Sequence, residues 1–375
     1  MSAITTTAKA DLATIARAFS LRGRYLAGVP HGNGHINDTY AVTCEEHGRR
    51  LRYILQRIND HVFQNVPALM ENIQRVTTHV ARNLAARGPA VNGWQTLKII
   101  PTREGAAYCR DPQGGYWRCY DFVENARTYD ILQDLRQARE AARAFGEFQC
   151  LLVDLEGPRL HETIPYFHDT RRRFDALRRA VAADRHGRAA ATETEIAFAL
   201  AREAMVDVLL GLQARGEIPE RITHNDTKLN NVMLDDTTTG QGVCVIDLDT
   251  VMPGLALYDF GDMVRSAANS AAEDETDLSR VRMQLPVFAA LVEGYLASAG
   301  PLLNETERAH LAFAARLITF EIGLRFLTDF LASDTYFKIH RPGHNLDRCR
   351  CQFALVRSME TQAAEMNAVV EKLTS

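Results

Sequence analysis

The chain has 375 residues and a mass of 41.9 kDa, so two domains, or one two-lobed domain, are expected. Its net charge of −4, with 24% charged and 46% apolar residues, gives no electrostatic case for binding nucleic acid or an anionic membrane. Small-molecule partners are expected instead, and the protein is expected to be a monomer or a weak homo-oligomer. The seven cysteines form no C-x-x-C pair, which indicates neither a disulfide framework nor a zinc site and favours a reducing, cytoplasmic location.

The N-terminal residues 1–19 lack a basic segment followed by a continuous apolar one, so no signal peptide is expected. Four apolar residues recur there at helical spacing and predict a surface helix packed on the body: Leu12, Ile15, Ala16 and Phe19. The most apolar stretch, residues 311–331, contains four charged residues and is therefore not expected to span a membrane.

The first third of the chain is expected to form a small α+β lobe. Short strands are predicted at 40–44, 51–56, 97–101, 106–110 and 116–122, with a hairpin turn at 111–115. One helix is predicted between the second and third strands, from Pro67 to Arg87, with proline near its start and Gly88 at its end.

The remainder is expected to be mostly helical. Helices are predicted near 131–154, 169–184, 192–214, 280–299, 305–331 and 347–373, interrupted by a β-rich segment at 222–250. This order predicts a β-rich N-lobe over 1–122, a hinge at 123–128 and a helical C-lobe over 129–375. A cleft between the two lobes is the usual place for a ligand site.

The densest cluster of functional residue types is ITHNDTKLNNVMLDD, residues 222–236, followed by VCVIDLDT at 243–250. The apolar runs in these segments predict a buried hairpin. Asp226 and Asn231 precede its first strand and Asp247 ends its second, so their side chains should meet at its open end. Carboxylate and amide oxygens of this kind suit magnesium carrying phosphates. Buried carboxylates are costly without a metal, a partner or a function.

The motif H-N-D-x-K-x-x-N, with His224, Asp226, Lys228 and Asn231, matches the kinase catalytic loop. The wider chain resembles the aminoglycoside phosphotransferase and choline kinase superfamily, which has a protein-kinase-like, two-lobed α+β fold. A closer resemblance, to the N-acetylhexosamine 1-kinases, rests on six segments within about residues 28–350: GNGHINDTYAV, YILQRIN, HNDTKLNNVMLD, VIDLDTVMPGL, YDFGDMVR and DTYFKIHRPGHNLDR.

The resemblance implies an ATP- and magnesium-dependent kinase acting on the anomeric hydroxyl of a sugar substrate. It assigns Asp226 to orienting or deprotonating that hydroxyl and Lys228 to the transferring γ-phosphoryl group. Asn231 and Asp247 would hold the magnesium. Asp249 would reach the sugar, a second metal or neither, and it would share the face of Asp247 only if the strand persists. His224 is expected to be a structural histidine.

The segment GVPHGNGHINDTYAVTC would cover the nucleotide phosphates. Gly32 and Gly34 would allow close approach of the backbone, and Asn37 would tolerate a left-handed conformation. His31 and Asn33 are candidate contacts to the sugar hydroxyls. Taken alone, the segment is equally compatible with an ordinary turn.

The following strand departs from the kinase pattern, because Gln56 occupies the place of the phosphate-binding lysine. Arg57 could substitute only if the strand ended or bulged there, since neighbouring strand residues face opposite sides. Glu71 is the candidate glutamate of the following helix, and Gln56 leaves its usual pairing open. By position alone, Phe122, Val123 and Glu124 would offer backbone groups to adenine.

In the C-lobe, Glu321, Arg325 and Asp329 recur at four-residue spacing, which predicts either a stripe of salt bridges or a polar wall of the sugar site. The resemblance favours Arg325 and Tyr336 as sugar contacts. Asp259, in the tripeptide Asp-Phe-Gly, is expected at a helix N-terminus, where its carboxylate would accept backbone N–H groups. It would thus be a structural brace and not a metal ligand.

Three alternatives stay open. The acceptor could be an aminoglycoside, choline or homoserine; the chain could be an inactive nucleotide or sugar sensor; or the carboxylates could serve a metal-dependent hydrolase. The sequence does not rank N-acetylglucosamine against N-acetylgalactosamine.

Overall fold

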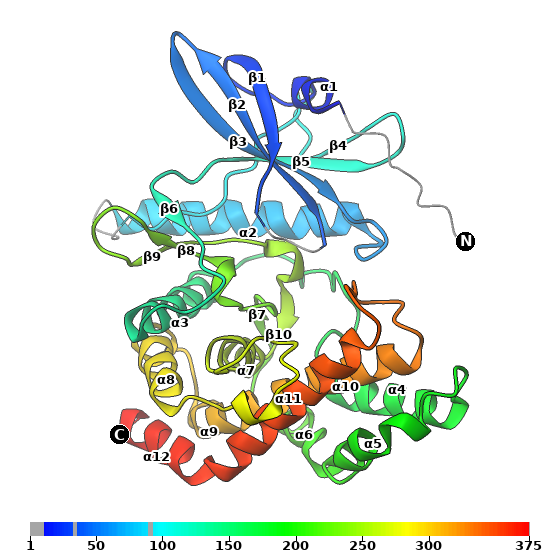
Figure 1. The fold of residues 1–375 in the computed structure, drawn as a ribbon. Helices are drawn as coiled ribbons and strands as arrows, with labels where there is room; N and C mark the ends of the chain where they lie inside the picture. The colour runs from blue at the N-terminus through cyan, green and yellow to red at the C-terminus, as the bar shows by residue number, and fades with distance from the viewer. Residues whose placement is uncertain (1–10, 33–35, 89–92, 375) are drawn as a thin grey trace. The chain divides into compact units, whose positions relative to one another are not determined.

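The computed structural model describes residues 11–32, 36–88 and 93–374. The chain forms two compact units (Figure 1). The first comprises residues 1–78 and 96–124, and the second comprises residues 79–95 and 125–375. The division falls inside helix α2 (Val66–Arg87) and again between Glu124 and Asn125.

The first unit contains a five-stranded antiparallel sheet. Its strand order is β1-β2-β3-β5-β4, with β1 Arg24–Pro30, β2 Asp38–Glu46, β3 Arg49–Ile58, β4 Cys109–Arg110 and β5 Tyr116–Asp121. His47 and Gly48 join β2 to β3 with positive φ angles of 51° and 77°, the backbone geometry that a tight hairpin requires.

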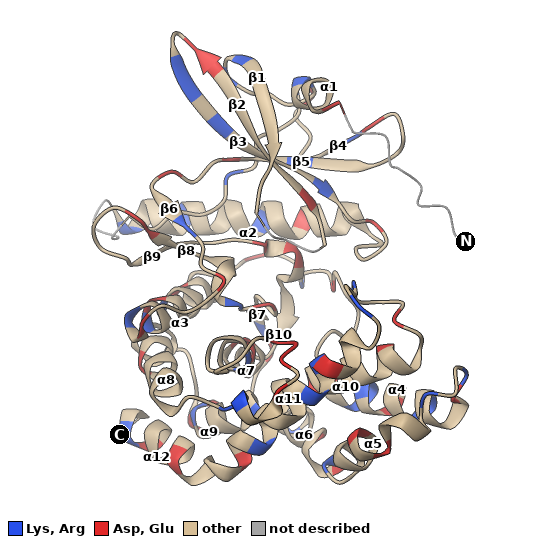
Figure 2. Ribbon diagram, viewed as in Figure 1, with Lys and Arg blue, Asp and Glu red and all other residues tan. Residues whose placement is uncertain are grey.

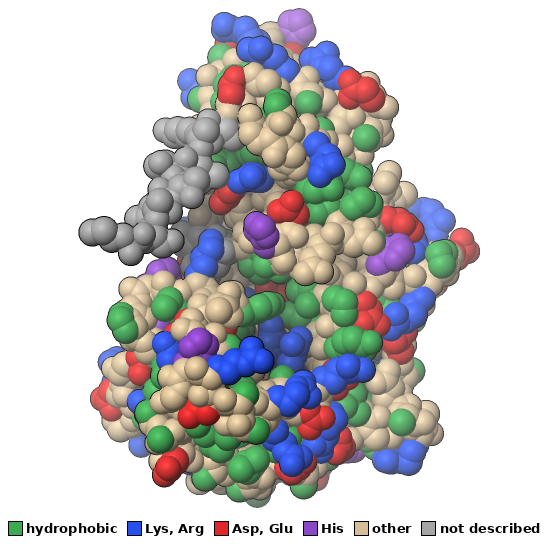
Figure 3. All heavy atoms as spheres, turned by 90° about the vertical axis from the view of Figure 1, so that its right-hand side faces the viewer, with side chains coloured by type: hydrophobic (Ala, Val, Ile, Leu, Met, Phe, Trp, Pro, Cys, Tyr) green, Lys and Arg blue, Asp and Glu red, His purple; other side chains and the backbone are tan. Residues whose placement is uncertain are grey.

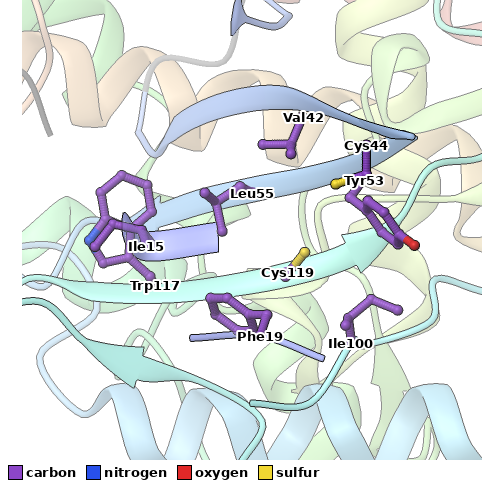
Figure 4. Packing of buried hydrophobic residues seen from close by; sticks show 9 residues of the cluster. All are labelled: Ile15, Phe19, Val42, Cys44, Tyr53, Leu55, Ile100, Trp117 and Cys119. Carbon is purple, nitrogen blue, oxygen red and sulfur yellow. The ribbon is translucent and has the colours of Figure 1, made fainter. Parts of the chain in front are cut away.

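One face of this sheet forms the core of the first unit. Alternate residues along β2, β3 and β5 point to the same side, and the α1 segment (Leu12–Arg17) packs on them. Figure 4 shows the resulting cluster of Ile15, Phe19, Val42, Cys44, Tyr53, Leu55, Ile100, Trp117 and Cys119. The predicted N-terminal surface helix is therefore confirmed, with Ile15, Ala16 and Phe19 buried.

One strand of this unit was not predicted, and one predicted strand was wrong. Strand β1 was not predicted, and its mostly exposed residues show no apolar alternation. The strand expected over 97–101 is reduced to a single bridge between Ile99 and Tyr120. The reason is that this segment shares the free edge of β5 with β4, which pairs Cys109 with Trp117.

Helices dominate the second unit. The longer ones are α3 Leu135–Leu151, α4 Thr170–Ala183, α7 Ala256–Ala267, α8 Leu285–Ala299, α10 Leu311–Leu331, α11 His344–Thr361 and α12 Ala363–Thr374. Helix α10 is buried along most of its length and packs against α4, α7 and α11, while α3 packs against α8. None of the helices in the described ranges is long and apolar enough to cross a membrane.

Three long predicted helices are interrupted. The region 347–373 divides at Gln362 into α11 and α12. The region 192–214 forms α5 Glu193–Leu200 and α6 Val208–Ala214, with a short 3-10 turn between them. The region 305–331 breaks at His310 into α9 Glu305–Ala309 and α10. A capping box of Asn304 and Glu307 starts α9, and the buried Glu307 is held by Arg221.

Two small sheets complete the second unit. Strand β7 (Arg221–Thr223) pairs with β10 (Met252–Gly254), and β6 (Ala126–Arg127) pairs with the hairpin of β8 (Val232–Asp235) and β9 (Gly242–Val245). The hairpin predicted from residues 232–246 is thus present. Acidic and basic residues are interspersed along the elements of both units (Figure 2) and on the face drawn in Figure 3.

Candidate active site

The segment 224–231 connects β7 to β8 and carries the kinase-like motif. Val232 pairs with Val245 across the hairpin, and the Ile246 N–H donates to the Asn231 carbonyl at 2.9 Å. This pairing brings the residues that precede β8 next to those that follow β9. The register of the hairpin therefore places Asn231 and Asp247 near each other along the backbone.

Asp226, Lys228 and Asn231 make direct side-chain contacts. The Lys228 ammonium lies 2.8 Å from one carboxylate oxygen of Asp226. The Asn231 amide nitrogen donates to the other oxygen at 3.2 Å and to the Asp226 carbonyl at 2.8 Å. These bonds fix the orientation of the Asp226 carboxylate.

The charges of this pair stabilise each other. Burial raises the pKa of the Asp226 carboxyl, but attraction to Lys228 and their hydrogen bond outweigh it and bring that pKa below the ordinary value. Burial lowers the pKa of Lys228, but attraction to Asp226 and Asp262 outweighs it and raises that pKa. Asp226 is therefore ionised at neutral pH, as a group that accepts a proton must be.

The donor set at Asn231 and Asp247 fits a magnesium ion. Because the amide nitrogen of Asn231 is held by Asp226, its amide oxygen is the atom left for ligation. Asp247 is exposed and has a left-handed backbone, with φ 58° and ψ 57°. One or two oxygen ligands from the protein, with phosphates and water, are what magnesium commonly uses.

Asp249 is placed differently from Asp247. Strand β9 ends at Val245, and residues 248–250 form a 3-10 turn, so the strand does not persist to Asp249. Asp249 is 2% exposed, whereas Asp247 is exposed. The condition under which the two carboxylates would share a face is not met.

Asp259 contacts the backbone of the segment 224–231, the candidate catalytic loop. Its carboxylate accepts the backbone N–H groups of His224 at 2.9 Å and Asn225 at 2.6 Å, and the Gln149 amide at 2.6 Å. Helix α7 begins at Ala256, so Asp259 lies in its first turn, at a helix N-terminus as expected from the sequence. The N–H groups that it accepts belong to the catalytic loop and not to its own helix.

His224 is fully buried between Phe145 and Phe148. Its Nε2 bonds to the Ile246 carbonyl at 2.8 Å, and its Nδ1 accepts the Asp226 N–H at 3.3 Å. Both ring nitrogens are therefore used to connect the catalytic loop to the residue that follows β9.

In the first unit, the phosphate-loop candidates are only partly within the described residues. Gly34 and Asn33 lie outside them. Gly32 has a φ of 74°, with open space where a side chain would begin, and the His31 ring lies 5.6 Å from that of Phe122. Asn37 is not among the residues with positive φ, so its expected left-handed conformation is wrong; its side-chain oxygen accepts the Asn59 N–H at 3.0 Å.

Arg57 does not take the place of the missing lysine. Strand β3 continues to Ile58 without a bulge, so Gln56 and Arg57 face opposite sides of the sheet. Arg118 of β5 lies directly opposite Gln56, and its Nε donates to the Gln56 side-chain oxygen at 3.0 Å. Arg118 was not predicted, because only the strand register places a guanidinium beside Gln56.

The proposed adenine-binding residues end the first unit. The Phe122 N–H donates to the Arg52 carbonyl at 3.3 Å, and the Arg52 guanidinium lies 3.8 Å from the centre of the Phe122 ring. Val123 is 7% exposed, and the Glu124 carboxylate pairs with Arg52.

A stripe of salt bridges does not form among Glu321, Arg325 and Asp329 of α10. Glu321 bonds to His168 and Thr170. Asp329 accepts the backbone N–H groups of residues 335–337 at 2.8–3.0 Å and the Asn345 amide at 2.9 Å. Arg325 has no hydrogen bond or ion pair within residues 11–32, 36–88 and 93–374.

Aromatic rings surround Arg325 instead. Its guanidinium carbon lies 4.8 Å from the ring centre of Phe167, 5.8 Å from Tyr336 and 5.6 Å from Phe337. Tyr336 is 56% exposed, and Asp329 fixes the backbone that carries it. Two candidate residues expected from the sequence, Arg325 and Tyr336, are thus brought together, and Phe167 joins them from a segment that was not predicted.

A β-rich unit, a helical unit and a catalytic loop of this composition define a kinase-type phosphotransferase. Residues 28–310 match the phosphotransferase enzyme family, and the chain belongs to that family. The protein-kinase-like α+β fold expected from the sequence is confirmed.

Several solved structures share this fold. A microcompartment-associated aminopropanol kinase is 16% identical with a TM-score of 0.58, covering 94% of this chain and 98% of that chain. A choline kinase from Cryptosporidium parvum is 12% identical with a TM-score of 0.55, covering 93% of each chain. Spectinomycin phosphotransferase APH(9)-Ia, in complex with ADP and spectinomycin, is 12% identical with a TM-score of 0.50, covering 89% and 92%.

Proposed function

We propose that the protein is an ATP- and magnesium-dependent kinase that phosphorylates the anomeric C1 hydroxyl of N-acetylhexosamines. The observation that carries phosphoryl transfer is the contact set of Asp226 with Lys228 and Asn231. The six sequence segments that resemble N-acetylhexosamine 1-kinases support the choice of acceptor.

The residues of the helical unit divide the chemistry among them. The ionised Asp226 would orient the acceptor hydroxyl and take its proton, while the Lys228 ammonium would stabilise negative charge on the transferring phosphoryl group. Asn231 and Asp247 would hold the magnesium. That ion, when bound, neutralises charge on the ATP phosphates. Alignment and charge neutralisation are the main demands of phosphoryl transfer.

The surroundings of Arg325 support a neutral acceptor that carries oxygen atoms. Within the part of the chain that the structure describes, Arg325 forms no ion pair. Such a guanidinium repels an ammonium group and donates hydrogen bonds to hydroxyl or carbonyl oxygens. Tyr336, exposed beside it, offers an apolar ring face and a hydroxyl. This combination disfavours choline and aminoglycosides, which are cationic, and suits a sugar with an acetamido group.

The test is an acceptor panel with coupled detection of ADP. N-acetylglucosamine and N-acetylgalactosamine are compared with choline, ethanolamine, homoserine and an aminoglycoside, and Asp226→Asn is the inactive control. Mass spectrometry and NMR of the product then locate the phosphate. We expect ADP release with either N-acetylhexosamine and a phosphate on C1.

Three results would contradict this proposal. Turnover with a cationic acceptor alone would retain the chemistry and replace the substrate. ATP binding without turnover on any acceptor would favour a sensor. Release of inorganic phosphate without a sugar phosphate would favour a hydrolase.

A further inference from the structure

A buried histidine connects helix α10 to the catalytic loop. His168, just before α4, is 5% exposed. Its Nδ1 lies 2.8 Å from a carboxylate oxygen of Glu321, and its Nε2 lies 3.1 Å from the carbonyl oxygen of Asn225. The Thr170 hydroxyl donates to the second oxygen of Glu321 at 2.7 Å. Glu321 itself is fully buried.

The hydrogen-bond inventory indicates which protons His168 carries. A neutral imidazole has one N–H group, whereas both ring nitrogens of His168 face acceptors. Burial raises the pKa of Glu321, but its interactions with His168, Arg325 and Arg173 outweigh burial and lower that pKa. Glu321 is therefore ionised, and both contacts of His168 are satisfied only when the ring is an imidazolium.

Other ionisable groups near this pair come from three directions. Tyr258 of α7 has its ring centre 5.1 Å from that of His168. Arg173 of α4 and Arg325 of α10 both attract Glu321, and Asp169 is the next residue in the chain. The hydrogen bonds of the His168 ring go instead to the Glu321 carboxylate and to the Asn225 carbonyl.

His168 bonds the carbonyl of Asn225, the residue directly before Asp226, so it can influence the position of Asp226. It belongs to the peptide group between Asn225 and Asp226, whose N–H donates to His224 at 3.3 Å. Asn225 has a positive φ of 65°, a conformation that needs support from its surroundings. The peptide group that leads into Asp226 is thus held at its oxygen by His168 and at its nitrogen by His224.

We propose that His168 is a positioning residue for Asp226, acting as a buried imidazolium that is bonded to Glu321 and to the Asn225 carbonyl. The inference rests on the proposed role of Asp226 as the group that orients the acceptor hydroxyl. It also connects two parts of the site, because Arg325 lies one helical turn beyond Glu321 on α10. Helix α10 therefore carries both Arg325, the proposed acceptor contact, and Glu321, which holds His168 against the catalytic loop.

Two substitutions separate the two bonds of the ring. The amide nitrogen of asparagine can occupy the position of Nδ1, so His168→Asn retains the contact to Glu321 and loses the bond to Asn225. Glutamine reaches the position of Nε2, so His168→Gln retains the bond to Asn225 and loses the contact to Glu321. Each variant removes one of the two bonds, and their melting temperatures show whether folding is affected equally.

We expect His168→Asn to lower kcat by about 10- to 100-fold, because a small displacement of a catalytic group has effects of this size. His168→Gln should retain kcat within about threefold, and KM for ATP should change little in either variant. Equal kcat values in the two variants, or kcat losses that follow the melting temperatures, would overturn the positioning role.

The protonation state is tested without turnover. Nitrogen-15 NMR of histidine-labelled protein at pH 7.5 resolves the two ring nitrogens, and the signals that disappear in His168→Gln identify His168 among the twelve histidines. We expect both nitrogens to carry protons, and the ring to become neutral in Glu321→Gln. A neutral ring in the unsubstituted chain would overturn the imidazolium.

The NMR result is independent of the acceptor. A charged His168 in a chain that fails to phosphorylate any N-acetylhexosamine would refute only the proposed function. A neutral His168 in a chain that phosphorylates them would refute only this inference.

Discussion

Asp259→Asn separates a structural role from a metal-binding one. In the native chain the Asp259 carboxylate accepts two backbone N–H groups and the Gln149 amide, all within 2.6–2.9 Å. An asparagine amide has only one accepting oxygen, so its NH₂ group must face the N–H of His224 or Asn225. One buried donor then loses its acceptor and a second unsatisfied donor is introduced, with an expected cost of about 2–4 kcal/mol.

The assay combines thermal unfolding with magnesium-dependent turnover. For Asp259→Asn we expect the melting temperature to fall by about 4 °C or more, with activity falling in step and an unchanged magnesium requirement. For the exposed Asp247, replacement by asparagine should leave the melting temperature nearly unchanged and reduce magnesium-dependent turnover by at least about 100-fold. Asp277→Asn, at an exposed carboxylate, is the control and should change neither.

The opposite pattern would refute this reasoning. An Asp259→Asn variant with the native melting temperature and a weakened response to magnesium would make Asp259 a metal ligand. A destabilised Asp247→Asn variant with native turnover would remove Asp247 from the proposed magnesium site.

Three further predictions concern single charges. Lys228→Met should move the acid limb of the pH profile of kcat/KM to higher pH, because Lys228 lowers the Asp226 pKa. Native activity is lost only as pH falls through that lowered pKa, and an acid limb that does not move would contradict the prediction. In ATP titrations, Arg118→Met should raise KM for ATP more than Arg57→Met does, because Arg118 and not Arg57 donates a hydrogen bond to Gln56. Equal effects of the two substitutions would remove Arg118 from the nucleotide site. Arg325→Met should raise KM for the N-acetylhexosamine by about 10-fold or more, as loss of a charged hydrogen bond does, and KM for ATP should not change.

Much of the fold could be predicted from local patterns. Alternation and turn residues located β2, β3 and β5, and helical periodicity located α1 to α4, because each of these elements buries one regular face. Strand β1 was missed because it buries almost none of its residues. The interruptions at 201–207, at His310 and at Gln362 were missed because apolar periodicity continues through them.

Within the site, the hairpin was the informative feature. The spacing of Asp226 and Asn231 before one apolar run, and of Asp247 after the next, predicted that these residues lie near one another, since pairing of neighbouring strands is local. The side-chain contact of Asn231 with Asp226 and the backbone pairing of Asn231 with Ile246 agree with this. The same spacing left the placement of Asp249 open, and the structure resolves it: a 3-10 turn follows β9, and Asp249 is buried whereas Asp247 is exposed.

The sequence by itself determined the catalytic motif, the order of a β-rich unit and a helical unit, and the family resemblance. Only the tertiary structure decided which charges pair. Glu321 and Arg325 are one turn apart, yet Glu321 bonds to His168, 153 residues away, and Arg325 is left among aromatic rings. Likewise, Gln56 meets Arg118 and not its neighbour Arg57. Local spacing gives the faces on which side chains lie, but the free energy of a buried charge depends on partners brought together by the fold.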